Sequence, residues 1–147
     1  MSAEVTVLIP VYNREQYILT AINSVLNQTY RHWKILLVDD GSTDNTIEVI
    51  EKNVSKDTPV TIIRNPTNLG QSQALNIGLN QTDTPYLVQL DSDDLFLPFT
   101  LDVLIKLAKN QPEDVAVFYG NYLKTSCDHQ GTIIKTILKK GCSYSVH

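Results

Sequence analysis

Short apolar runs alternate with amphipathic runs along this chain, and no other feature of the sequence constrains the fold as strongly. The apolar runs have the length and the β-branched content of buried strands. They predict strands over 5–11, with Pro10 marking the end, and over 33–38, 59–64, 86–90, 115–122 and 132–137. Apolar residues at helical spacing predict helices over 17–26, through Ile47 and Ile50, from Ala74 to Leu79 and from Leu101 to Ala108. Strands that alternate with helices form a mostly parallel sheet covered on both faces, so we predict an α/β fold.

Composition narrows the functional class. The chain has 147 residues, of which 42% are hydrophobic and 19% charged, as in a globular domain with its own core. A net charge of −4 with no long basic run argues against a nucleic-acid partner. No run approaches the roughly 18 apolar residues of a membrane span, and no signal-peptide pattern opens the chain. Cys127 and Cys142 form no CxxC pair, so free thiols and a cytoplasmic location are expected, with a disulfide as the alternative.

Polar side chains follow the first, second and fourth predicted strands. The three segments are Pro10-Val11-Tyr12-Asn13, Asp39-Asp40-Gly41-Ser42 and Asp91-Ser92-Asp93-Asp94. Ligands of open parallel sheets bind beyond the carboxyl ends of the strands. If these strands are neighbours, five carboxylates converge on one crevice, which would repel a phosphate unless a metal is present.

The last of these segments has the spacing of a metal site. Asp91 and Asp93 are two residues apart, so in an extended chain their side chains share one face. Hard cations such as Mg²⁺ take one or two protein carboxylates and fill the other positions with water and substrate phosphate. The alternative is a surface turn that caps the next helix. The second acidic cluster, Asp39-Asp40, favours the metal site.

Five segments in this order resemble family 2 glycosyltransferases of the GT-A fold. They are Val-Leu-Ile-Pro-Val-Tyr-Asn-Arg (7–14), Ser-Val-Leu-Asn-Gln-Thr-Tyr (24–30), Leu-Val-Asp-Asp-Gly-Ser-Thr-Asp (37–44), Asn-Leu-Gly-Gln-Ser-Gln-Ala-Leu-Asn-Ile-Gly-Leu (68–79) and Leu-Asp-Ser-Asp-Asp (90–94). The resemblance covers roughly the first 125 residues. It implies a Rossmann-like fold and inverting transfer of a sugar from a nucleotide-diphosphate donor, commonly a UDP-sugar, with Mg²⁺ or Mn²⁺.

The resemblance also implies roles for individual residues. Those that would contact the nucleotide sugar are Pro10, Val11, Tyr12, Asp40, Asp91 and Ser92. The ring of Tyr12 would stack on the base, and Asp40 would accept a hydrogen bond from a base N–H. Asp91 would hold the ribose or a metal-bound water, and Asp93 would ligate the metal that bridges the diphosphate. The alternatives are a corner residue for Tyr12 and a helix cap for Asp40, while Asp94 faces solvent or caps the next helix.

Two departures from the family pattern concern the donor and the acceptor. The family often has Ala-Arg-Asn where this chain has Ala74-Leu75-Asn76. Gln71 and Gln73 could replace the arginine, although surface helix positions are the simpler interpretation. After Val115 the only carboxylate is Asp128, beside a predicted hairpin turn, so the catalytic base is left unassigned. We therefore expect a single nucleotide-sugar-binding domain over 1–147 that lacks a complete acceptor half.

Other interpretations follow from the missing base. A nucleotide-sugar-binding module without turnover needs the same donor contacts as an enzyme, so the motifs do not separate the two. A receiver-type signalling domain is rejected because its acidic pair would follow the first strand, and a dehydrogenase because no GxGxxG follows a strand.

The acceptor would be an unknown saccharide or glycoconjugate. The apolar and lysine-rich tail over 133–140 could be a strand, a dimer interface or a surface that lies near a membrane.

Overall fold

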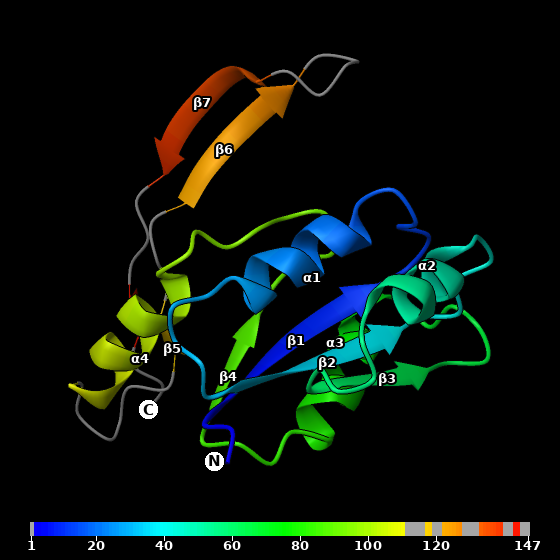
Figure 1. Cartoon of the computed structure of the whole chain (residues 1–147), viewed down its shortest axis with the longest axis horizontal. Helices are drawn as coiled ribbons and strands as arrows, with labels where there is room; N and C mark the ends of the chain where they lie inside the picture. The colour runs from blue at the N-terminus through cyan, green and yellow to red at the C-terminus, as the bar shows by residue number, and fades with distance from the viewer. Residues whose placement is uncertain (1, 111–116, 119–121, 128–132, 140–142, 145–147) are drawn as a thin grey trace. The chain divides into compact units, whose positions relative to one another are not determined.

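The computed structural model describes residues 2–110 and, beyond them, the backbone of 117–118, 122–127, 133–139 and 143–144 (Figure 1). The chain divides into two compact units, Met1–Asp102 and Val103–His147. The first unit contains every residue that was assigned to the donor site or the metal. No helix of the described residues is long and apolar enough to cross a membrane.

A four-stranded parallel sheet forms the centre of the first unit. Its strands are β1 (Val5–Val11), β2 (Trp33–Asp39), β3 (Val60–Arg64) and β4 (Tyr86–Gln89). They lie in the order β3-β2-β1-β4, and every pairing is parallel. All seven residues of β1 are buried, as expected for a strand between two others. The three strands that end in polar segments are therefore neighbours, as the prediction required.

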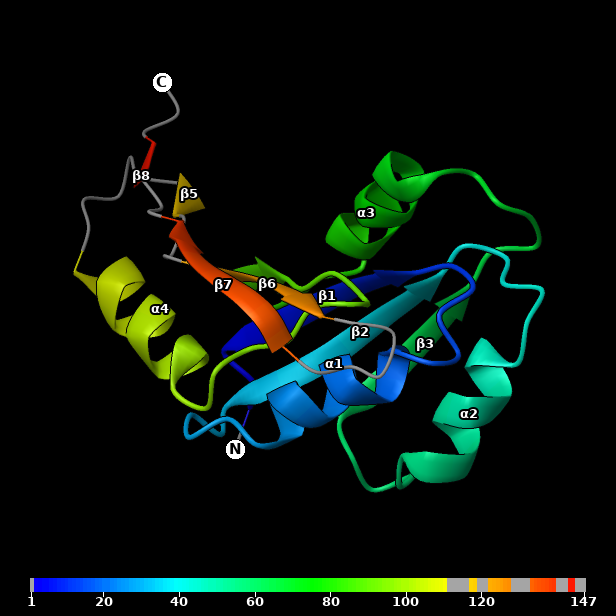
Figure 2. The ribbon, with the colours of Figure 1, turned by 90° about the horizontal axis from the view of Figure 1, so that it is seen from above.

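Helices cover both faces of this sheet, which confirms the predicted fold class. The helices are α1 (Ile18–Leu26), α2 (Thr46–Asn53) and α3 (Gln71–Asn80). Figure 2 shows α3 on one face of the sheet and α1 and α2 on the other. A fourth helix, α4 (Thr100–Lys109), crosses from the first unit into the second. The buried face of α1 consists of Ile18, Ala21, Ile22 and Val25, which are the apolar residues that predicted this helix.

Pro10 lies inside β1 and does not mark its end. Pairing between β1 and β4 stops at Leu8, whose carbonyl oxygen accepts a hydrogen bond from the amide of Leu90 at 3.0 Å. Pairing between β1 and β2 continues to Val11 and Asp39. Backbone groups alternate in direction along a strand, so Pro10 faces the same side as Leu8, where β4 has already ended. Its missing N–H therefore removes no hydrogen bond from the ladder.

Short antiparallel pairs make up the described part of the second unit. β5 (Val117–Phe118) pairs with β8 (Ser143–Tyr144), and β6 (Tyr122–Cys127) pairs with β7 (Ile133–Lys139). The strand expected over 115–122 is thus represented by β5 and by the start of β6, and the strand expected over 132–137 is found as β7. Asp128, which we considered and disfavoured as a catalytic base, lies outside the described residues.

Gly78 brings α3 close to β1. A Cβ atom at this position would lie 2.2 Å from Cδ1 and 2.8 Å from Cδ2 of Leu8, which is only 1% exposed. Leu8 belongs to the core cluster that also contains Leu36, Val38 and Ala74. A glycine in the middle of a helix is unfavourable by about 1 kcal/mol relative to alanine, and here it allows this close contact.

Replacing Gly78 with alanine should lower the free energy of unfolding by about 1–3 kcal/mol, the usual cost of overpacking a core. In a Leu8→Ala background the same replacement should cost nothing or stabilise, because the colliding methyl groups are gone and alanine favours the helix. Urea unfolding of the four proteins measures this coupling. If Gly78→Ala lowered the free energy of unfolding equally in both backgrounds, the contact with Leu8 would not explain why a glycine occupies position 78.

Candidate functional site

Hydrogen bonds join the segment that follows β1 to the segment that follows β2. Asn13 has φ 52°, a left-handed conformation that asparagine tolerates better than most residues. Its side-chain oxygen accepts hydrogen bonds from the amides of Thr43 at 2.8 Å and Asp44 at 3.3 Å, and its own amide donates to Oγ of Ser42 at 2.9 Å. The amide of Arg14 donates to Oγ1 of Thr46 at 2.8 Å. These bonds fix the end of β1 against the start of α2.

Tyr12 follows β1 directly and presents its side chain to solvent. It is 39% exposed, whereas Pro10 and Val11 are buried within the strand. Of the three residues that the resemblance assigns to the base, Tyr12 is thus the one whose ring is available for stacking on a planar ligand. The other two could border such a ligand only through their backbone.

Asp40 is buried, and its carboxylate holds the loop between β3 and α3. It is 2% exposed. Oδ1 accepts hydrogen bonds from Nδ2 of Asn65 at 2.8 Å and from the amide of Leu69 at 2.9 Å, and Oδ2 accepts one from the amide of Gly70 at 2.7 Å. Burial by itself would raise the pKa of Asp40, but the hydrogen bonds from Leu69, Asn65 and Gly70 outweigh it and hold the pKa below its ordinary value.

The neighbours of Asp40 complete this packing. Asp39 is fully buried; its Oδ1 accepts a hydrogen bond from the amide of Ser42 at 3.1 Å, and its Oδ2 lies 3.5 Å from Nε of Arg64. Gly41 has φ 76°, and a Cβ atom there would lie 2.6 Å from the carbonyl carbon of Thr67. Glycine is therefore required both by the left-handed backbone conformation and by the close approach of the loop.

Asp91 to Asp94 form an exposed acidic turn at the end of β4. The amide of Asp94 donates to the carbonyl oxygen of Asp91 at 3.0 Å, which closes the turn. Oδ1 of Asp91 accepts hydrogen bonds from Nε2 of Gln89 at 2.9 Å and Nε2 of Gln71 at 3.4 Å. Burial, together with repulsion from Asp91 and Asp93, raises the pKa of Asp94. The turn therefore concentrates negative charge that a cation would offset.

Helix α1 anchors the chain just beyond this turn. Gln28 is fully buried; its Nε2 donates to the carbonyl oxygen of Leu97 at 2.7 Å, and its Oε1 accepts from the amide of Leu101 at 2.9 Å. Oγ of Ser24 accepts a hydrogen bond from the amide of Phe96 at 3.0 Å. The backbone of the acidic turn is thus held between β4 on one side and the anchored residues Phe96, Leu97 and Leu101 on the other.

The acidic turn has the donor chemistry of a site for Mg²⁺ or Mn²⁺. No group of three or more His, Cys, Asp or Glu side chains in the described part of the chain is placed to hold a metal ion. Cations of this kind need only one or two protein carboxylates when substrate phosphate supplies further oxygens. Asp91 is half-buried, and Asp93 and Asp94 are exposed. Hard carboxylate oxygens open to solvent therefore fit such an ion bound together with a phosphate.

The structure separates the five carboxylates into two groups. Asp39 and Asp40 are buried beneath the loop over 65–70, and Asp91, Asp93 and Asp94 remain in the acidic turn. The expected convergence of all five on one open crevice is therefore not found. The amide of Gly70 binds Asp40 and the side chain of Gln71 contacts Asp91, so the start of α3 lies between the two groups. Its positive end favours carboxylates on both sides.

Sequence reasoning missed several residues that build the site. The functions of Asn13, Ser24 and Gln28 as positioning residues were not identified, although all three lie in segments that carry the family resemblance. Arg14 was also missed, although its Nε lies 3.6 Å from Oδ2 of Asp93. A polar residue inside an otherwise apolar helical run, as Ser24 is, was the available signal, but its partner lies 72 residues away.

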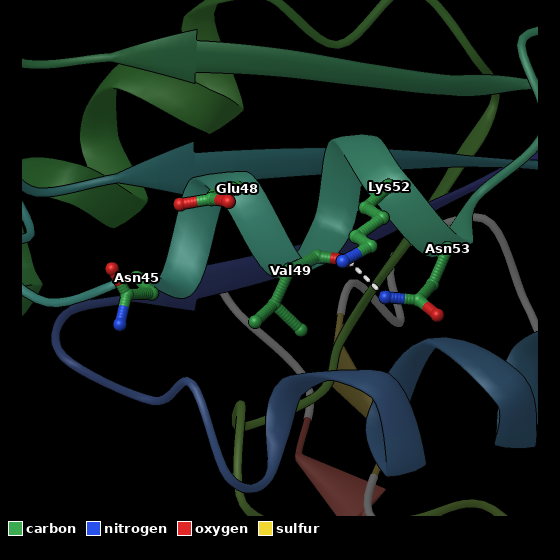
Figure 3. Close-up of a pocket in the computed structure, with 5 residues that line it drawn as sticks. All are labelled: Asn45, Glu48, Val49, Lys52 and Asn53. Carbon is green, nitrogen blue, oxygen red and sulfur yellow. Dashed lines mark hydrogen bonds between the residues drawn. The ribbon is translucent and has the colours of Figure 1, made fainter.

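A separate hollow of about 410 Å³ runs along α2 (Figure 3). It is lined by Asn45, Glu48, Val49, Lys52 and Asn53. All five residues belong to α2 or immediately precede it, and Figure 3 shows the hydrogen bond from Nδ2 of Asn53 to the carbonyl oxygen of Val49, 2.8 Å long. A groove lined by one helix does not surround a ligand, so the candidate site remains at the strand ends.

Comparisons with known proteins agree with this geometry. The sequence profile of glycosyl transferase family 2 matches residues 6–132. An uncharacterized glycosyltransferase of Haemophilus influenzae is 37% identical over 133 residues, which is 90% of this chain. The structure of S. aureus TarS in complex with UDP-GlcNAc has a TM-score of 0.69 at 29% identity, over 78% of this chain. The mannosyltransferase PcManGT from Pyrobaculum calidifontis, in complex with GDP-Man and Mn²⁺, has a TM-score of 0.71 at 25% identity, again over 78%.

These likenesses confirm the GT-A fold. The chain spans 52% of the length of the Haemophilus influenzae relative, 33% of the TarS chain and 34% of the PcManGT chain. The family match over 6–132 includes β2, β3, β4 and the acidic turn, and all of β1 except Val5.

Replacing Asp40 with asparagine should lower the free energy of unfolding at pH 7 by about 1–3 kcal/mol, because the loop amides lose a charged acceptor. The pKa of Asp40 is lower in the folded chain than in the unfolded one. Its contribution is therefore fully present above the unfolded pKa of about 3.9 and is lost as the pH falls through the folded pKa. The difference between wild type and Asp40→Asn should accordingly shrink in acid.

Urea unfolding at pH 7, 5 and 3 measures this difference. Asp57→Asn is the matched control, because it removes the same charge from an exposed position. A difference between wild type and Asp40→Asn that stays constant with pH would contradict a charged Asp40 as the residue that holds the loop.

Proposed function

This chain belongs to glycosyl transferase family 2, and from that membership we propose that it binds a nucleotide-diphosphate sugar, specifically a UDP-sugar, for inverting transfer to a saccharide or glycoconjugate. One observation carries the proposal. The exposed ring of Tyr12 and the acidic turn over 91–94 follow two strands, β1 and β4, that are direct neighbours in the sheet. A flat aromatic surface beside a metal-binding turn suits a ligand with a base at one end and a diphosphate at the other.

Each end of the ligand has assigned residues. The base stacks on Tyr12, bordered by Pro10 and Val11. Asp40 accepts from a base N–H; its Oδ2 accepts one hydrogen bond in the free chain, from Gly70, and a carboxylate oxygen has room for a second. Asp91, with the buried Ser92 beside it, holds the ribose or a metal-bound water.

Asp93 is the proposed ligand of a divalent cation. When bound, Mg²⁺ or Mn²⁺ would act as a Lewis acid that offsets the charge on the departing nucleoside diphosphate. PcManGT, which shares this fold, was solved with Mn²⁺. The residues of this chain hold the acidic turn in place, through Gln28 and Ser24, and keep its carboxylates accessible from solvent.

Calorimetric titration of UDP into the chain, first with Mn²⁺ and then with EDTA, tests the proposal. We expect binding that requires the metal, because the acidic turn repels a diphosphate without it. The titration is repeated with GDP and TDP. Binding of GDP or TDP in place of UDP would show that the base of the donor is not uracil. If no nucleoside diphosphate binds, the proposed donor site is wrong.

Replacing Asp93 with alanine should abolish the metal-dependent part of UDP binding and leave the thermal midpoint unchanged, because Asp93 is exposed. Asp83→Ala is the matched control. Asp83 is also exposed, precedes β4 at the opposite edge of the sheet, and pairs there with Lys34. Unchanged affinity for UDP with Mn²⁺ in Asp93→Ala would remove Asp93 from the metal site.

A further inference from the structure

Arg14 connects the end of β1 with the acidic turn that follows β4. Its Nη1 donates hydrogen bonds to the carbonyl oxygens of Asn13 at 3.1 Å and Tyr12 at 3.4 Å. Its Nε lies 3.6 Å from Oδ2 of Asp93. The guanidinium therefore touches the backbone of the residue proposed to bind the base and the side chain proposed to bind the metal.

Positive charge is scarce at this edge of the sheet. Among the lysines and arginines of residues 2–102, only Arg14 and Arg64 stand at the carboxyl end of a strand. Arg64 lies beside the buried carboxylate of Asp39, with Nε 3.5 Å from Oδ2. Arg14 is thus the cation that offsets the charge of the acidic turn, where three carboxylates occur in four residues.

We propose that Arg14 binds the diphosphate of the nucleotide donor and exchanges Asp93 for phosphate oxygens when the donor and its metal bind. This inference rests on the proposed function. A nucleotide whose base lies on Tyr12 and whose metal lies at Asp93 must place its diphosphate between them, and Arg14 contacts both residues. Taking up the metal frees Arg14, because the cation then satisfies Asp93.

The ion pair with Asp93 is easily exchanged. The side chains of Arg14 and Asp93 are 41% and 51% exposed, and exposed ion pairs contribute little to stability. Arginine carries five N–H donors in a planar fork that matches phosphate oxygens in a bidentate manner. The two hydrogen bonds from Nη1 to backbone carbonyls hold one side of the guanidinium at the end of β1. Once Asp93 binds the metal, Nε and Nη2 can donate to phosphate oxygens.

Binding of UDP and of uridine, both with Mn²⁺, tests this assignment in the full chain. The two ligands differ only in the diphosphate. Arg14→Ala should weaken UDP binding about 10-fold to 100-fold, the effect of losing a charge-assisted hydrogen bond, and should leave uridine affinity unchanged. Arg14→Lys should lie in between, because lysine keeps the charge without the fork. Affinity for Mn²⁺ alone should stay the same or increase, because Arg14 no longer competes for Asp93.

Arg31→Ala is the matched control. Arg31 is exposed and precedes β2 at the opposite edge of the sheet, so its removal changes the net charge equally and should leave UDP binding as in wild type. If wild type binds UDP and Arg14→Ala binds it equally well, the role of Arg14 is wrong while the proposed function stands. The role of Arg14 would also be wrong if Arg14→Ala weakened the binding of UDP and of uridine equally. The same conclusion would follow if Arg31→Ala weakened UDP binding as much as Arg14→Ala does. If wild type binds no nucleoside diphosphate, both proposals fall.

Discussion

The position of β1 between β2 and β4 is the constraint on which the rest of this structure depends. Parallel pairing on both sides brings the ends of three strands to one edge. Because β1 is buried throughout, its residues up to Val11 are apolar apart from Thr6, and exposed polar side chains begin at Tyr12. Every residue proposed for the donor site lies at one of these strand ends or directly after it. Pro10 is tolerated in this central strand because β4 ends before it, and the early end of β4 places the acidic turn beside Tyr12.

Two acidic clusters at one edge would repel each other, and the fold accommodates them in different ways. Asp39 and Asp40 are buried, with hydrogen bonds from backbone amides and the side chain of Asn65, and with Arg64 near Asp39. A buried carboxylate needs such partners, because desolvation otherwise favours its neutral form. The acidic turn over 91–94 keeps contact with water, and within the described residues its charge is offset by Arg14 and by amide donors. The buried cluster thus holds the loop over 65–70 in place, and the carboxylates of the acidic turn stay open to solvent.

The anchoring of the acidic turn explains why α1 matters to a site that it does not line. Ser24 lies in α1 and Gln28 lies two residues after Leu26, its last residue, and both bind the backbone that follows the turn. Gln28 has no access to solvent, so its amide would be costly to bury without these partners. These bonds fix the backbone that follows Asp91, Asp93 and Asp94. Because the chain belongs to glycosyl transferase family 2, we interpret this anchored acidic turn as the place for a metal-bound diphosphate.

The sequence by itself determined the alternation of strands and helices, the parallel sheet and the acidic turn, because burial period and strand-end chemistry are local properties. A glycine inside the apolar helical run over 74–79 is likewise visible in the sequence, and the structure shows that Leu8 is the residue it meets. Only the tertiary structure decided which carboxylates stay accessible, because Asp40 is covered by amides about 30 residues further along the chain. It also decided the partners of Gln28 and Arg14, which lie about 70 to 80 residues away. Such pairings depend on the order of strands in the sheet and on the path of loops between them, and neither is encoded in a local pattern.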